Sequence, residues 1–157
     1  MELSARSLEN RLGRVRDLES RFTYRMSMLC KTLDLEASEL LRGTPVTLTA
    51  YNVLIVVETF DQISISDISR FNVMDRAQVS RTANDLGRRG YVSFSDDPHS
   101  KRKKMVSITQ KGKDLLEELL PSFEKRRAAL EEKLGPEGFS ALWIGMDRLH
   151  EVLNNKS

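Results

Sequence analysis

The 157-residue sequence has little of several features that define common classes of protein. It contains one cysteine, so no disulfide can form within the chain and a reducing compartment is expected. No apolar run approaches the roughly 20 residues that a helix needs to span a bilayer. The first residues, 1–20, are charged throughout and lack the apolar segment of a signal peptide. We therefore expect a cytoplasmic protein without membrane contact.

Residue patterns for catalysis and metal binding are equally scarce. The two histidines, His99 and His150, lie far apart and have no cysteine or carboxylate cluster at ligand spacing. The sequence has no G-x-S-x-G elbow, no Walker loop and no H-E-x-x-H motif. We therefore expect neither an enzyme nor a protein that holds a metal or another cofactor.

Positive charge is concentrated in one part of an otherwise ordinary composition. With 39% hydrophobic and 31% charged residues, the chain has the composition of a soluble protein with a substantial core. Its net charge is only +2, yet residues 70–105 contain nine lysines and arginines against four aspartates. Such a local excess favours an anionic partner, with nucleic acid as the leading candidate.

Residues 66–90 have the pattern of two helices joined by a tight turn at 72–74. Ser66 and Asp75 are suitable N-caps for the two helices, because their side-chain oxygens can accept hydrogen bonds from amides of the first turn. A short helix, a turn and a second helix with a polar outer face are typical of a helix-turn-helix.

The second helix is amphipathic, and its outer face is rich in arginine. Val79, Ala83 and Leu86 lie three or four positions apart and therefore share its inner face. Gly90 ends it, because glycine readily adopts the left-handed conformation. Candidates for contacts with base edges and neighbouring phosphates lie in its first turns: Arg76, Gln78, Ser80, Arg81 and Thr82.

Two strand-like segments follow, 91–95 and 104–109, in which apolar and polar residues alternate. Turn-forming residues and a run of cations lie between them. A hairpin with a basic tip beside such a helix is typical of a wing that lies along a phosphate backbone. We expect sequence-independent phosphate contacts from Arg88, Lys101, Arg102 and Lys103. Ser66, at the start of the first helix, is a further candidate DNA contact.

Helical periodicity continues on both sides of this region. The apolar spacing predicts a long helix over 8–40 that is broken near Gly13, with residues 1 to about 18 as a separate arm. Residues 48–60 are apolar on almost all sides, which predicts a buried helix. Residues 63–65 are a candidate third strand.

Two helices are expected in the last part of the chain. One covers 111–134 and is kinked at Pro121, and another covers 139–153 after a break at Gly135-Pro136. The first and last helices carry more apolar surface than a small winged lobe can cover, so a second subunit is expected.

Short motifs recur in a fixed order between residues 48 and 112: Leu48-Thr49, Val79-Ser80-Arg81, Leu86, Arg89-Gly90-Tyr91-Val92, Asp97-Pro98, Arg102 and Ile108-Thr109-Gln110-Lys111-Gly112. In this order and spacing they resemble the MarR family of winged helix-turn-helix regulators. The sequence departs from that family at Ser100, where an acidic residue often pairs with the wing arginine. It departs again at Gly87, where the family often has glutamate and where this sequence offers no explanation for a glycine.

The resemblance implies a fold and a mode of action. The fold is mainly α with a small β-hairpin wing (α+β), a winged helix-turn-helix whose N- and C-terminal helices form a dimerisation region. We expect a single MarR-like domain over 1–157, with dimerisation helices at about 1–45 and 112–157 and a DNA-binding lobe at about 46–111. The implied function is that of a homodimeric repressor that binds a pseudo-palindromic site in double-stranded DNA.

Other interpretations remain open at this point. Regulators of this family often respond to small aromatic or anionic effectors, and Tyr24, Met28 and Tyr51 are candidates to line such a site, although plain core packing is the alternative. Cys30 is a candidate redox sensor in a regulator of the same kind, with inert packing as the alternative. A winged-helix module that binds proteins instead of specific DNA is the main competing function.

Overall fold

The structure of the protein, a computed structural model, describes residues 2–97 and 100–154, and of residues 2–7, 9 and 100–102 it describes the backbone alone. The chain divides into two compact units, residues 1–49 and 50–157. Within the described part, no helix has an apolar stretch long enough to cross a bilayer.

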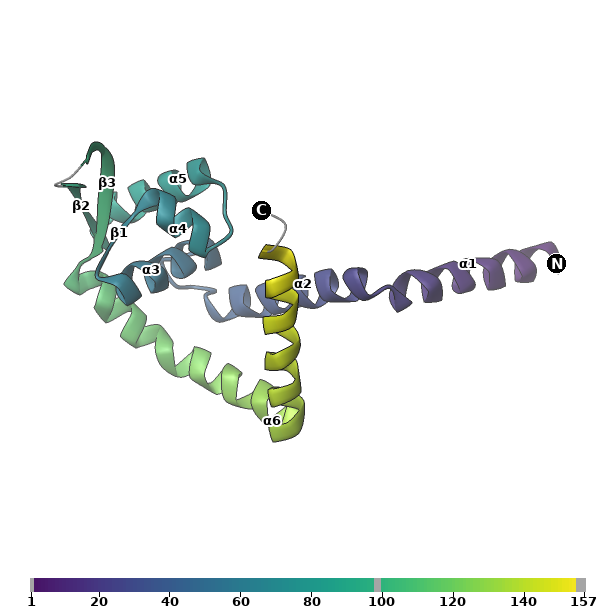
Figure 1. Ribbon diagram of the computed structural model, residues 1–157. Coiled ribbons are helices and arrows are strands. Elements are labelled where there is room, and N and C mark those ends of the chain that lie inside the picture. The colour runs from purple at the N-terminus through teal and green to yellow at the C-terminus, as the bar shows by residue number, and fades with distance from the viewer. Residues whose placement is uncertain (1, 98–99, 155–157) are drawn as a thin grey trace. The chain divides into compact units, whose positions relative to one another are not determined.

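The first unit consists of two helices, α1 (Glu2–Ser20) and α2 (Phe22–Leu40), which follow one another along the chain (Figure 1). The predicted break near Gly13 is wrong, because Gly13 lies inside α1 and the interruption falls at Arg21, whose φ of −72° and ψ of 119° are extended. One glycine weakens a helix by only about 1 kcal/mol, which is too little to end it. At the actual break, the hydroxyl of Ser20 donates to the carbonyl of Asp17 at 2.8 Å, a bond that competes with helical pairing.

The second unit contains the remaining helices and a three-stranded sheet: α3 (Leu48–Phe60), β1 (Gln62–Ser64), α4 (Ile65–Phe71), α5 (Arg76–Arg88), β2 (Val92–Asp97), β3 (Ser100–Ile108) and α6 (Gln110–Asn154). The sheet is antiparallel with the order β1-β3-β2 (Figure 1). The predicted fold class, mainly helical with a β-hairpin wing, is therefore confirmed. The predicted third strand is confirmed as well, at 62–64.

The core of this unit lies where α3, α4, α5 and the sheet meet. Its fully buried side chains are Val53, Leu54, Val57, Ile68, Val79, Ala83, Leu86 and Val106. The bounds of α3 agree with the predicted 48–60, but its burial is less complete than expected. Ile55 and Phe60 on α3 are 40% and 44% exposed, because the described packing covers mainly the opposite face of the helix.

Two local predictions for the wing region need correction. The N-cap of α4 is Ser64 instead of Ser66, and its hydroxyl oxygen accepts a hydrogen bond from the amide of Asp67 at 3.2 Å. Strand β3 begins at Ser100, four positions before the predicted start, so that the cationic run lies in the strand. Asp96 stands directly opposite Lys104 in the ladder, and opposite charges at paired positions favour this longer pairing.

Helix α6 is long and leaves much of its apolar surface uncovered. Its backbone is interrupted at Gly135, with φ of 68° and ψ of 166°, which confirms the predicted break. The helix continues through Pro121, as its periodicity predicted. Leu115 and Leu119 are buried. Further along the helix, large exposed apolar side chains include Leu134, Leu142, Trp143, Ile144, Met146, Leu149, Val152 and Leu153.

The turn between α4 and α5 places Val73 in an unfavourable conformation. Its φ is +49° and its side chain is 92% exposed. A left-handed backbone costs an ordinary L-residue about 1–2 kcal/mol, and burial of this side chain contributes nothing to offset it. Val73→Gly should therefore raise the free energy of unfolding in urea by about 1 kcal/mol. Val73→Ala, which keeps the Cβ, is the matched control and should raise the free energy of unfolding clearly less. Equal increases for the two variants would contradict the explanation by left-handed backbone strain.

Candidate nucleic-acid interface

Helix α5 is held by its inner face, which leaves its outer face to solvent. Val79, Ala83 and Leu86 have no exposed surface. Because an α-helix turns through about 100° per residue, Arg81 points away from this face, Gln78 and Ser80 lie at its sides, and Thr82 lies at its border. Of the predicted base-contacting residues, Arg76, Gln78 and Arg81 are exposed and Ser80 and Thr82 are half-buried: all five remain accessible on this helix.

The start of α5 is fixed by the predicted N-cap. The carboxylate of Asp75 accepts hydrogen bonds from the amides of Ala77 and Gln78, at 2.9 and 3.1 Å. These are two of the amide groups that a helix leaves without partners at its N-terminus. Asp75 thereby orients the first turn of α5, which carries Arg76 and Gln78.

Gly87, which sequence reasoning left unexplained, has a reason in the tertiary structure. A Cβ atom on Gly87 would lie 2.6 Å from Cε2 of Phe94, a ring carried by β2. The aromatic ring of the wing strand therefore packs against the backbone of α5 at the one position without a side chain. Nothing in the local sequence indicates this contact, because the two residues belong to different elements.

A small hollow of about 180 Å³ lies where the starts of α4 and α5 meet β3. Its lining residues are Ser64, Ile65, Ser66, Arg76, Ser80, Lys103 and Lys104. We call this hollow the basic pocket. It is lined by three cations and three hydroxyl groups. The hydroxyl of Ser64 donates to the carboxylate of Asp67 at 2.6 Å, so the donors suited to the oxygens of a phosphate group are the three cations and the hydroxyls of Ser66 and Ser80.

The basic pocket joins residues that the sequence presented as separate candidates. Ser66, Arg76, Ser80 and Lys103 were predicted as DNA contacts from three different segments. Ser64 and Lys104 were missed. Lys104 had been counted in the cationic run of the wing and at the start of a strand but had not been named as a DNA contact, and Ser64 stood inside a candidate strand. Their proximity to the start of α5 depends on the pairing of β1 with β3, which no local pattern contains.

Some predicted contacts lie elsewhere. Arg88 is on the last turn of α5, where its guanidinium pairs with the carboxylate of Asp85 at 2.9 Å. The pair is exposed and contributes little to stability, but Asp85 offsets part of the positive charge there. The side chains of Lys101 and Arg102 lie outside the described residues, so their phosphate contacts stay predictions, and the loop position His99 lies outside them too.

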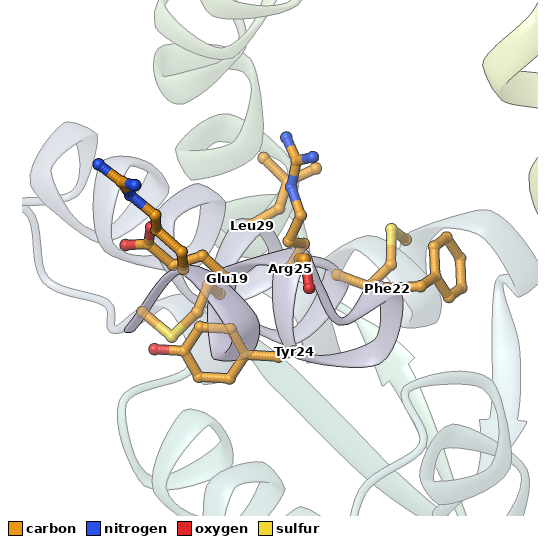
Figure 2. A pocket seen from close by; sticks show the side chains of 9 residues that line it. Glu19, Phe22, Tyr24, Arg25 and Leu29 are labelled. Atoms are coloured by element: carbon orange, nitrogen blue, oxygen red, sulfur yellow. The ribbon is translucent and has the colours of Figure 1, made fainter. Parts of the chain in front are cut away.

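The predicted effector residues belong to both units, and the surroundings of each are given within its own unit. Tyr24 and Met28 border an open hollow of about 920 Å³ around the junction of α1 and α2, and the labelled side chains in Figure 2 point outward in different directions. Tyr51 stacks on Phe123 with ring centroids 4.2 Å apart. Burial raises the pKa of Tyr51, and the negative charge of Glu124 raises it further. One face of this ring is thus occupied by ordinary core packing, and the effector assignment stays a prediction.

Other chemical sites are absent from the part of the chain that the structure describes. No three histidine, cysteine, aspartate or glutamate side chains in it gather as metal ligands. Cys30 is a free thiol on the exposed side of α2. His150 is exposed on α6. Among the described residues, the outer face of α5 with the basic pocket is therefore the best-supported candidate for a functional site.

Comparison with known proteins agrees with this geometry. Residues 44–103 match the model of the MarR family. The DNA-binding transcriptional repressor ScoC of Bacillus subtilis is 27% identical over 113 residues, which are 69% of this chain and 56% of ScoC. The chain thus spans about half the length of the curated relatives it matches.

Solved structures show the same fold. Sco3205, a MarR family transcriptional regulator from Streptomyces coelicolor solved in complex with DNA, has a TM-score of 0.75 and 21% identity, covering 86% of this chain and 88% of that one. The structure of BpsR of Bordetella bronchiseptica, whose DNA binding is regulated by 6-hydroxynicotinic acid, has a TM-score of 0.76 and 20% identity. The match covers 85% of this chain and 95% of that one.

The double role of Asp75, a cap that also carries a negative charge beside Arg76, can be separated by substitution. Asp75→Ala removes the cap and should lower the free energy of unfolding by about 1 kcal/mol. Asp75→Asn keeps a capping oxygen and removes the charge, so it should change stability by less and bind a DNA duplex more tightly. Urea unfolding measures the change in stability, and a duplex-binding titration measures the change in affinity. Weaker DNA binding by Asp75→Asn would contradict the placement of the Asp75 charge at the DNA interface.

Proposed function

We propose that this chain, whose residues 44–103 match the model of the MarR family, is a transcriptional regulator of that family that binds a specific site in double-stranded DNA. The observation that carries the proposal is the exposed face of α5 beside the basic pocket. A polar helix face with a cationic hollow at its start is suited to a major groove and its flanking phosphates. The family is one of regulators, and it gives no support to an enzymatic role.

Sequence would be read by the outer side chains of α5. Arg81 and Gln78 are both exposed. Arginine can form two hydrogen bonds with guanine and glutamine two with adenine, and each good pair contributes about 1–3 kcal/mol of discrimination. Thr82 and Ser80 lie beside them and would contact neighbouring bases or phosphates.

Phosphates would be held by the basic pocket and the wing. Arg76, Lys103 and Lys104 surround the pocket, and its hydroxyl groups supply further polar contacts. Such contacts orient the protein on the duplex but carry no sequence information. They should also make binding strongly dependent on salt, because each neutralised phosphate releases counterions.

The active form would be a homodimer. The exposed apolar side chains of α6 exceed what a monomer in water normally leaves uncovered, and a second copy of the same helix is the simplest cover. A two-fold dimer places two recognition helices about 34 Å apart, in successive major grooves. The target site would then be a pseudo-palindrome.

The relatives support a direction of regulation. ScoC is a repressor, which supports a repressor role here. BpsR responds to an aromatic acid, which supports release of this protein by a small aromatic or anionic effector. A titration of the protein–DNA complex with small aromatic acids tests this part, and unchanged affinity across the series would count against it.

Selection from a random duplex pool at about 0.15 M salt tests the main proposal. The expected result is one enriched pseudo-palindrome. Arg81→Ala should then lose about 1–3 kcal/mol of preference at one base pair, whereas Lys103→Ala should weaken binding to all duplexes alike. Lys133→Ala, an exposed lysine on α6, removes the same charge away from the interface and should bind as the unaltered protein does.

Absence of any enriched sequence from a folded dimer would contradict specific DNA binding and favour a protein-interaction module. Equal effects of Arg81→Ala and Lys103→Ala on every duplex would contradict the separate roles given to the helix and the pocket.

The dimer is tested by one substitution on the apolar stripe of α6. Leu149→Asp puts a carboxylate among exposed apolar side chains, and desolvation of that charge should shift the protein from dimer to monomer. Ser140→Asp, at an exposed polar position on the same helix, should leave the dimer intact. Sedimentation equilibrium measures both, and a Leu149→Asp protein that dimerises as tightly as the unaltered one would exclude this stripe from the interface.

A further inference from the structure

The long helix α6 begins beside the end of the recognition helix, and the two are joined by hydrogen bonds. The ammonium group of Lys111 donates to the carbonyl of Arg89 at 2.9 Å. The hydroxyl of Thr109 donates to the carbonyl of Gly90 at 2.7 Å, and the amide of Thr109 donates to that of Tyr91 at 3.0 Å. The three consecutive carbonyls that follow α5 are therefore bonded to Thr109, just before α6, and to Lys111 in its first turn. We call these five residues the wing-root joint.

Side-chain contacts add to these hydrogen bonds. The ring of Tyr91 is 7% exposed, with the ammonium of Lys111 at 4.8 Å and the guanidinium of Arg89 at 5.3 Å from its centroid. A cation over an aromatic face is attracted by the ring quadrupole. Gly112 approaches so closely that an added Cβ would lie within the contact distance of the Tyr91 carbonyl oxygen. The first turn of α6 is thus in close contact with Tyr91.

Three functional elements meet at this joint. The last turn of α5 closes with the amides of Arg89 and Tyr91 bonded to the carbonyls of Asp85 and Leu86. Strand β2 of the wing starts at the next residue, Val92, and α6 leads away from the base of the wing (Figure 1). The positive charge of Lys111 lies near the C-terminal end of α5, where the helix dipole is negative and favours a cation.

We propose that the wing-root joint sets the orientation of the recognition helix relative to α6, with Lys111 as its positioning residue. The inference rests on the proposed function, in which α6 carries the dimer contact and α5 reads the DNA. In such a dimer, the distance between the two recognition helices depends on the angle between α5 and α6. A loosened joint leaves each lobe able to read its half-site but relaxes the required spacing between half-sites.

The test compares duplexes that carry the selected half-sites at their natural spacing or moved apart by about two base pairs, a change that rotates and displaces one half-site. The unaltered protein should lose about tenfold or more in affinity on this change. Lys111→Met keeps the aliphatic stem over Tyr91 and removes the charge and the hydrogen bond. It should bind the natural spacing several-fold more weakly and lose less than about threefold on the change of spacing.

Two variants separate positioning from general electrostatics. Lys113→Met removes the same charge from an exposed position two residues further along α6, and it should keep the full spacing preference. Lys111→Arg can still donate to the Arg89 carbonyl and lie over the ring of Tyr91, so it should retain most of that preference. A loss of folding stability alone would weaken binding to every spacing equally and would not flatten the preference.

A Lys111→Met protein with the spacing preference of the unaltered protein would overturn this inference and leave the proposed function intact. So would a Lys113→Met protein that relaxes spacing to the same degree. Failure of the unaltered protein to select any duplex would instead overturn the proposed function, and the inference with it.

Discussion

The winged lobe depends on the burial of one face of α5. Val79, Ala83 and Leu86 have no exposed surface, and Ile68 of α4 and Val106 of β3 are fully buried in the same core. Each large apolar side chain that is fully buried contributes about 1.5–3 kcal/mol relative to exposure. A rotation of α5 about its axis would expose these side chains and bury arginines in their place. The same packing that stabilises the lobe therefore determines which residues face outward.

Charge is arranged around this buried face according to position along the helix. Near the start of α5, Arg76 meets Lys103 and Lys104 of the wing strand around the basic pocket. Near its end, Asp85 pairs with Arg88 and with Arg89, at 2.9 and 3.4 Å. Three cations thus gather near the start of the helix, where a phosphate would also meet the positive end of the helix dipole. The end of the helix is occupied instead with structural contacts to α6.

Local sequence patterns were sufficient to predict a structural feature wherever that feature depends on residues that are neighbours in the chain. The amphipathic period of α5, the Asp75 cap and the left-handed Gly90 were all predicted and confirmed, because each follows from contacts within a few residues along the chain. The predicted cap at Ser66 was wrong by two positions, because Ser64 can use its hydroxyl to bond the Asp67 amide and Ile65 already begins the helix. Such boundary errors are typical when several hydroxyl residues compete for one cap.

The amino-acid sequence by itself determined the helix-turn-helix pattern, the wing, the concentration of positive charge and the apolar stripes of the terminal helices, since these are periodic properties of single segments. Only the tertiary structure decided that Gly87 makes room for Phe94, that Ser64 and Lys104 border the same pocket as Arg76, and that Lys111 binds the end of α5. The physical reason is distance along the chain. These contacts join residues from different elements, and their geometry exists only after the sheet has paired and the core has packed.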